Sequence, residues 1–412
     1  MTAVSAQNLP AYALFAALLS AAGLPIYIHA PKFFVDEYGV SLAALGAVLF
    51  GLRMLDVVQD PLLGRLSERL RHRRGLAVAV GALIMALAMI GLFAVEPPVS
   101  VLVWFALMLT LVFSAFSFLT ICFYAQGVAK AGVLPGAGHL ALARWRETGA
   151  LLGVCAASVA PVVLGQVMDA PFAGFAAGFG ILAVMAVLFM RAEWRDADLP
   201  ASTGFGTVLA DPVARKLLGI ALVNAAPVAV SSSLFLFYVE FALAAPGWEG
   251  ALLLLFFLSA AIAAPIWGVL GERFGAKRML LCAMGLGIVT FGGALFLGPG
   301  DAAIFAVICV ASGAVLGADL TILPAMFASR MAKISPSAAE GFGLWSFVSK
   351  FTLALAAIAL FPILEGAGLQ ATGAVTPPEA VRLLVLLYAG VPCVLKLFAI
   401  LLLCRVSGLE DE

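Results

Sequence analysis

Charged side chains are scarce in this chain. Asp, Glu, Lys and Arg make up 11% of its 412 residues, whereas 64% are hydrophobic. A water-soluble globular fold is excluded, because it would have no interior large enough for so much apolar surface. Lipid is therefore the expected solvent, and the zero formal net charge gives no indication of nucleic-acid binding.

The sequence also lacks the motifs of several enzyme classes. It has no P-loop, nucleophile elbow or zinc motif, which argues against ATP hydrolysis and against a membrane enzyme. Its six cysteines lie in apolar runs without metal-type spacing, and its three histidines are scattered. We therefore expect no enzymatic activity, no cofactor and no disulfide framework.

Long apolar runs are what the chain has instead. There are about twelve of them, each close to the length of a membrane-spanning helix, which predicts an all-α polytopic membrane protein. The first run is too long for a removable signal peptide and has no cleavage site. The runs lie near 11–30, 40–63, 75–95, 99–125, 143–168, 172–191, 214–243, 249–271, 276–298, 302–329, 340–365 and 380–405.

Lysine and arginine concentrate in the connections that follow every second run, whereas the opposite connections are mostly acidic. By the positive-inside rule, both termini are cytoplasmic. We expect an integral, multi-pass protein of a bacterial inner membrane that functions as a monomer.

A motif repeats at almost half the chain length. Pro61-x-x-Gly64-x-Leu66-x-Glu68-Arg69 recurs 204 residues later as Pro265-x-x-Gly268-x-Leu270-x-Glu272-Arg273. The repeat predicts two pseudo-symmetric six-helix bundles, residues 1–191 and 213–412, joined by a cytoplasmic linker at 192–212. Parallel duplication of six-helix units, with a short basic loop after the second helix, resembles the major facilitator superfamily across the whole chain.

Three ionisable residues interrupt the second run. Arg53, Asp56 and Asp60 project from one face of a helix, so one cation could contact both carboxylates. Charges at bilayer depth are costly and are normally retained for ion or substrate binding. The second half has no charges at the equivalent positions, Phe257, Ala260 and Ala264.

The segment Arg53-x-x-Asp56-x-x-Gln59-Asp60-Pro61-x-x-Gly64 is similar to the helix-two motif of the glycoside-pentoside-hexuronide:cation symporters, the melibiose carrier-like family. The resemblance implies that Asp56 and Asp60 bind sodium, lithium or a proton. Gln59 belongs to the same motif, and Ser117 lies close to the family's polar helper on helix four. No metal other than this sodium ion is expected.

Lys350 lies about ten residues into the eleventh run without a local acid, and it resembles the family's helix-eleven lysine near the cation site. We predict that Lys350 and Arg53 form charge pairs with the helix-two acids. Two alternatives stay open: Lys350 could extend to the membrane interface, and Arg53 with Asp60 could only fix helix packing.

The predicted solute cavity has few charges. Sugar-transporting members of the family carry acids on helices one and four, where this chain has Ser20 and Thr120, so a galactoside is disfavoured and an amphipathic solute is favoured. The other predicted residues of the solute cavity are Tyr124, Trp345 and Arg146. Of these, Arg146 is similar to a helix-five arginine of the family. Arg146 could equally belong to a charged helix end, and Glu240 and Asp319 are expected near helix ends.

The basic loops are predicted to gate the cytoplasmic side through networks of ion pairs, since single exposed pairs contribute little. The predicted gating residues are Glu68, Arg69, Arg73, Arg74, Glu272, Arg273, Lys277 and Arg278.

The sequence therefore predicts a secondary transporter, coupled to sodium or protons, that moves a small organic or amphipathic solute by alternating access. A proton-driven exporter of hydrophobic compounds would use the same acids. A membrane assembly factor or sensor that kept the fold without transport is the alternative from another class.

Overall fold

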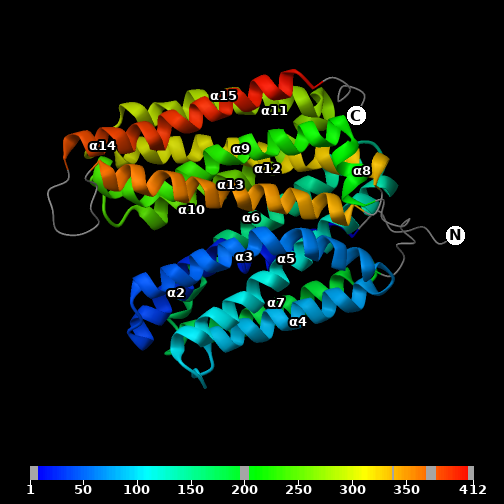
Figure 1. Ribbon diagram of the computed structural model, residues 1–412, viewed down its shortest axis with the longest axis horizontal. Helices are drawn as coiled ribbons and strands as arrows, with labels where there is room; N and C mark the ends of the chain where they lie inside the picture. The colour runs from blue at the N-terminus through cyan, green and yellow to red at the C-terminus, as the bar shows by residue number, and fades with distance from the viewer. Residues whose placement is uncertain (1–7, 195–203, 336–337, 368–376, 407–412) are drawn as a thin grey trace. The chain divides into compact units, whose positions relative to one another are not determined.

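The computed structural model describes residues 8–194, 204–335, 338–367 and 377–406. Within these ranges, the side chains of Arg53 and a few other helical residues lie outside the description. Every described element is a helix, with no strand among the described residues (Figure 1). The predicted all-α class is confirmed.

By its internal contacts the chain divides into two units, residues 1–208 with 328–347 and residues 209–327 with 348–412. Three helices, α8 (Phe205–Ala210), α12 (Ala302–Ile334) and α13 (Ala339–Gly366), contribute residues to both units. The predicted linker at 192–212 stays a prediction, since its residues 195–203 lie outside the described ranges.

In the first unit, α1 packs against α6 and α7, while α3 and α4 pack against α5. Phenylalanine, leucine and alanine fill the core between them. The helices are α1 (Leu9–Ala21), α2 (Leu24–Tyr38), α3 (Leu42–Arg69), α4 (Arg74–Phe93), α5 (Val101–Val133), α6 (Gly138–Leu164), α7 (Pro171–Met190) and α8 (Phe205–Ala210).

In the second unit, α15 packs against α9 and α11, and α10 packs against α11. One π turn extends α9 and another joins α14 to α15. The helices and turns are α9 (Pro212–Phe237), its π turn (Tyr238–Ala242), α10 (Glu249–Phe274), α11 (Ala276–Gly292), α14 (Pro378–Val385), the second π turn (Leu386–Gly390) and α15 (Val391–Cys404).

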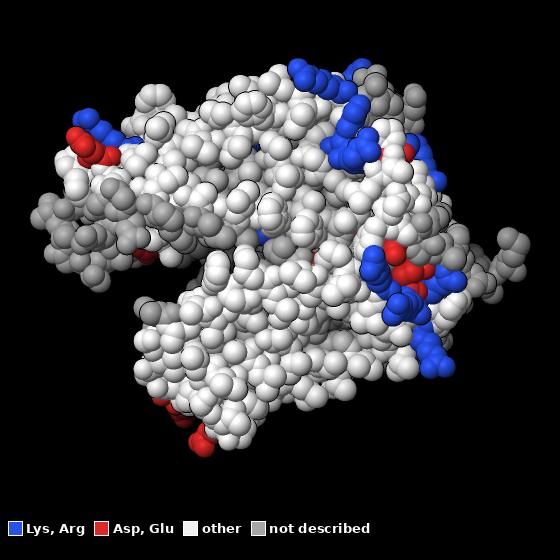
Figure 2. All heavy atoms as spheres, viewed as in Figure 1, with Lys and Arg blue, Asp and Glu red and all other residues white. Residues whose placement is uncertain are grey.

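Among the described residues, nine helical segments are long and apolar enough to cross a membrane. Their outer faces carry large apolar side chains, such as Leu87, which is 57% exposed, and Val289, which is 76% exposed. Helices that are apolar on all sides suit a lipid surround. In Figure 2 the surface over the helices is almost free of Lys, Arg, Asp and Glu, which gather near helix ends.

The other three predicted runs are helical too. The first is divided into α1 and α2 at Gly23, because Pro25 stands in the first turn of α2. The second is α3, whose start is capped by the Ser41 hydroxyl accepting from the Ala44 amide at 3.3 Å. The eleventh is α13.

Glycines bring particular helices into close contact. A Cβ atom on Gly149 of α6 would lie 2.1 Å from the Ala13 carbonyl oxygen of α1, and one on Gly153 would lie 2.5 Å from that of Ala17. In the second unit, a Cβ on Gly313 would lie 2.2 Å from the Phe256 carbonyl oxygen. Small residues at these positions therefore let the helix backbones approach closely.

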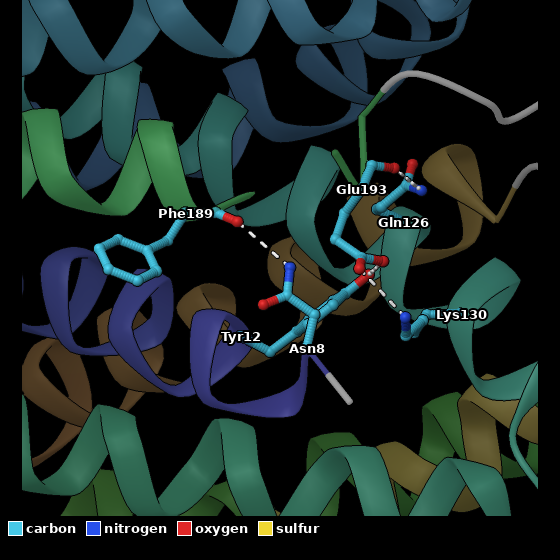
Figure 3. A network of polar contacts seen from close by, with 6 residues as sticks. All are labelled: Asn8, Tyr12, Gln126, Lys130, Phe189 and Glu193. Atoms are coloured by element: carbon cyan, nitrogen blue, oxygen red, sulfur yellow. Dashed lines mark hydrogen bonds and ion pairs between the residues drawn. The ribbon is translucent and has the colours of Figure 1, made fainter. Parts of the chain in front are cut away.

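A polar network joins the ends of α1, α5 and α7 (Figure 3). The Glu193 carboxylate, just beyond α7, pairs with Lys130 Nζ of α5 at 3.1 Å and accepts from the Tyr12 hydroxyl of α1 at 3.4 Å. The Glu193 carbonyl accepts from Gln126 Nε2 at 2.6 Å. The Lys130 side chain is only 2% exposed, so the Glu193 carboxylate offsets part of the cost of burying its charge.

We expect Glu193→Gln to destabilise the protein by about 3 kcal/mol, because the amide keeps the shape but removes the negative charge 3.1 Å from the buried Lys130 ammonium. The melting temperature of the detergent-solubilised protein measures this. Glu193→Gln with Lys130→Met should recover part of the loss, and Glu379→Gln, at an exposed acid of α14, should have almost no effect. Equal melting temperatures for all variants would contradict the pairing.

Candidate cation and solute site

The two acids of the second run lie near the middle of α3, one turn apart, and both are buried. Asp56 is 3% exposed and Asp60 is fully buried. The helix places both carboxylates on one face, as the four-residue spacing predicts. Acids buried within a largely apolar stretch of helix are costly and are normally retained for ion or substrate binding.

Hydrogen-bond donors surround the acids. Gln59 Nε2 donates to Asp56 Oδ1 at 2.8 Å, and Ser114 Oγ of α5 donates to Gln59 Oε1 at 2.9 Å. Ser346 Oγ of α13 donates to Asp60 Oδ2 at 2.5 Å. The acids therefore sit in a polar cluster built by three helices of the first unit.

Close backbone approach makes the contact between α3 and the beginning of α13 possible. A Cβ on Gly64 would lie 3.2 Å from the Ala339 carbonyl oxygen, and one on Gly343 would lie 3.3 Å from the Asp60 carbonyl oxygen. The glycine of the repeated loop motif thus has a packing role beside the acids. It lets the Ser346 hydroxyl reach Asp60.

The predicted helper Ser117 is fully buried on α5, three residues after Ser114. Ser114 and Ser346 were missed by the sequence analysis. Ser114 could have been found, because it lies almost one helical turn before Ser117. Nothing in the sequence alone connects Ser346 to α3, 286 residues away.

The structure describes the predicted cationic partners of Asp56 and Asp60 less completely than the acids themselves. Arg53 belongs to α3, but its side chain lies outside the described residues. Lys350 is half-buried on α13 and belongs to the second unit, whereas the acids belong to the first. Pairing of either cation with Asp56 or Asp60 stays a prediction.

Two predicted solute residues, Tyr124 and Arg146, lie together. The guanidinium carbon of Arg146 lies 3.9 Å from the centre of the Tyr124 ring, a cation–π contact. Arg146 Nε pairs with Glu147 Oε1 at 2.7 Å, and the Tyr124 hydroxyl donates to the same oxygen at 3.2 Å. Arg146 and Glu147 are each 5% exposed, so they form a buried cluster and not an exposed helix end.

The remaining residues of the predicted solute cavity are Thr120, Ser20 and Trp345. Thr120 precedes Tyr124 by one turn of α5, and its buried hydroxyl has no hydrogen-bond partner among the described residues. Ser20 near the end of α1 and Trp345 of α13 are half-buried. Arg146 Nη2 is likewise buried without a partner in the described part of the chain. Thr120 and Arg146 therefore each carry a buried polar atom that is unsatisfied within the described residues.

The predicted gating residues divide into exposed and buried groups. Glu68 Oε1 pairs with Arg71 at 3.1 Å, and Lys277 Nζ donates to the Val406 carbonyl at 2.8 Å. Arg74 differs from the expectation of a loop residue, since it begins α4, is 3% exposed and donates to Gln126 Oε1 at 3.4 Å. The exposed members are Arg69, Arg73, Glu272, Arg273 and Arg278.

The expectation for Asp319 was wrong. Asp319 lies near the middle of α12, is 8% exposed and pairs with Lys396 of α15. The predicted tenth run ended at 329, whereas α12 continues to Ile334. Lys396 was missed, although it is a charged residue well inside the last apolar run. The other early expectation, Glu240, is exposed in the π turn after α9.

Comparisons with solved structures agree with this architecture. Crystal structures of a bacterial homologue of the iron transporter ferroportin, outward-facing and outward-facing with soaked iron, give TM-scores of 0.70 and 0.68. In both, identity is 16%, and the match covers 96% of this chain and 98% of the other. At this identity the likeness shows the fold alone. None of the curated proteins compared with the chain matches it.

Residues 10–407 match the family described as MFS/sugar transport protein. This finding confirms the predicted membership of the major facilitator superfamily, and it is consistent with the resemblance to the melibiose carrier-like family. Because the match spans nearly the whole chain, the protein belongs to the MFS/sugar transport protein family of the major facilitator superfamily.

Proposed function

We propose that the protein is a cation-coupled secondary transporter that binds sodium or a proton at Asp56 and Asp60 and moves a small organic or amphipathic solute by alternating access. The observation that supports this proposal is the pair of buried carboxylates one turn apart on α3. Gln59 and Ser346 donate hydrogen bonds to these carboxylates and so help to orient them.

A cation binds such a site for electrostatic reasons. Two neighbouring carboxylates repel each other as anions, and a low-dielectric surround strengthens that repulsion. A proton would relieve it by neutralising one acid. Sodium would do so through hard oxygen ligands from the two carboxylates and the buried Ser117 hydroxyl. The same charge change would favour an occluded conformation, because a neutral site costs less to bury.

For the solute, the cluster of Tyr124, Arg146 and Glu147 is the proposed contact. The ring gives an apolar surface, and Arg146 Nη2 is a buried donor without a described partner. Sugar-transporting members of the family have acids on helices one and four, at the positions that Ser20 and Thr120 occupy in this chain. A solute with an apolar body and one polar or anionic group suits this set better than a galactoside does.

Uptake into proteoliposomes tests the proposal. Sodium and pH gradients are imposed separately, and a panel of sugars and radiolabelled lysolipids or fatty acids is offered. We expect accumulation of an amphipathic solute with one of the two gradients, and none when an ionophore dissipates it. Gradient-driven efflux of hydrophobic compounds would instead favour the exporter. Absence of any solute movement across the panel would favour the non-transporting alternative.

A further inference from the structure

The second unit contains a pocket of its own, and none of the acids of α3 lines it. Its volume is about 70 Å³, and its walls come from α9, α10, α11, α12 and α15. Apolar side chains form most of the wall, including Phe256, Phe291 and Leu316. Asp319 and Lys396 supply its charged groups. All of these residues belong to the second unit.

The charged groups are held in a defined arrangement. Lys396 Nζ contacts Asp319 Oδ2 and donates to Asn224 Oδ1 of α9 at 2.7 Å. The side chains of Asp319 and Lys396 are each only 7% exposed. Asp319 Oδ1, the other carboxylate oxygen, is buried and has no hydrogen-bond partner among the described residues. One strong acceptor in this pocket is therefore unsatisfied.

The local charge selects the kind of ligand. Lys396 already neutralises Asp319, so a second cation at the carboxylate would be repelled by the lysine. An anion would be repelled by the unpaired Oδ1. A neutral molecule with a hydrogen-bond donor meets neither penalty and satisfies the acceptor. This charge balance distinguishes the pocket from the α3 site, where two acids lie together.

We propose that this pocket binds a neutral amphipathic molecule with one hydrogen-bond donor, such as a hydroxyl group, on a short hydrocarbon body. The donor binds Asp319 Oδ1, and the hydrocarbon packs against Phe256, Phe291 and Leu316. Lys396 holds the carboxylate in place, and Asn224 in turn accepts a hydrogen bond from Lys396. The proposal does not depend on cation coupling or on the solute of the transport cycle.

Cys393 of α15 lines the same pocket and is half-buried, so its thiol is a native reporter of occupancy. A variant that keeps Cys393 as its single cysteine is reconstituted in nanodiscs and alkylated with N-ethylmaleimide. The probes are hexan-1-ol and its isomer 1-methoxypentane, which has the same atoms but cannot donate a hydrogen bond. A second single-cysteine variant keeps Cys282, an exposed thiol of α11 that does not line the pocket.

We expect hexan-1-ol to slow alkylation of Cys393 about threefold once its concentration reaches about twice its Kd, because a bound ligand excludes the reagent. The ether should protect far less, and Cys282 should react equally with and without either probe. In Asp319→Leu with Lys396→Met, a charge-neutral pair of substitutions of a kind that cores often tolerate, the two isomers should become equivalent.

Equal protection by the two isomers in the parent protein would overturn the proposal, as would preference for hexan-1-ol that survives the double substitution. Protection of Cys282 to the same extent would show a general membrane effect and overturn it too. A thiol at Cys393 that never reacts, or that reacts identically without and with hexan-1-ol, would show a closed or water-filled pocket and have the same consequence.

Discussion

Replacing Asp60 with asparagine is expected to abolish gradient-driven accumulation of solute while the folded protein stays in the membrane. The amide has the shape of the carboxylate, and its oxygen can still accept the hydrogen bond from Ser346. It lacks the charge that attracts a cation. Loss of about 3 kcal/mol of charge-assisted binding lowers cation affinity by about a hundredfold.

Uptake by proteoliposomes that contain Asp60→Asn measures this effect, with the melting temperature as a check on folding. Asp169→Asn is the matched control, because Asp169 is an exposed acid outside the helices. Ala260→Asp, which adds an acid at the position equivalent to Asp56 in the second half, should not create a second coupling site. Concentrative uptake that persists in Asp60→Asn would remove this residue from the cation site.

The acids of α3 could be predicted because the information is local. A four-residue spacing within one helix fixes the relative direction of Asp56 and Asp60 without any tertiary contact. Gln59 is in the same helix and was included because it belongs to the motif that resembles the symporter family. The burial of the two acids could be expected from the apolar residues around them, since a charged residue in a membrane helix faces the protein interior and not lipid.

The partners from other helices could not be predicted in this way. Ser114 lies 55 residues from Gln59, and Ser346 lies 286 residues from Asp60. Serine is frequent in membrane helices and commonly donates to a carbonyl one turn earlier in the same helix, as Ser233 Oγ does to the Ala229 carbonyl at 2.8 Å. Only the packing of the helices distinguishes the hydroxyl groups that reach the acids.

The pair of Asp319 and Lys396 shows a related limit. Each residue alone in an apolar run suggests a helix end, where its charge would reach the interface. The two residues are 77 positions apart, so the pattern of neither run contains the other. The internal repeat did not indicate this pair either, because the repeated loop motif ends at Glu272 and Arg273 and includes neither Asp319 nor Lys396. A pair buried between helices α12 and α15 becomes visible only in the folded chain.

A second large effect on stability is expected where α1 lies in close contact with α6. Gly149→Ala is expected to destabilise the protein by about 3 kcal/mol or more, since the added methyl group would meet the backbone of Ala13 and not a flexible side chain. To relieve the clash, α1 must move away from α6, which also carries Arg146. The melting temperature and the yield of monodisperse protein in detergent measure the loss.

Gly178→Ala in α7 is the matched control, because the substitution is identical and also lies inside a membrane helix. A Cβ atom on Gly178 has nothing within 4 Å, so no contact opposes it. Alanine restricts the unfolded backbone more than glycine does, and we expect stabilisation by about 0.5–1 kcal/mol. The two variants should therefore change the melting temperature in opposite directions. A decrease of equal size in both would mean that α1 and α6 are not in backbone contact at Gly149.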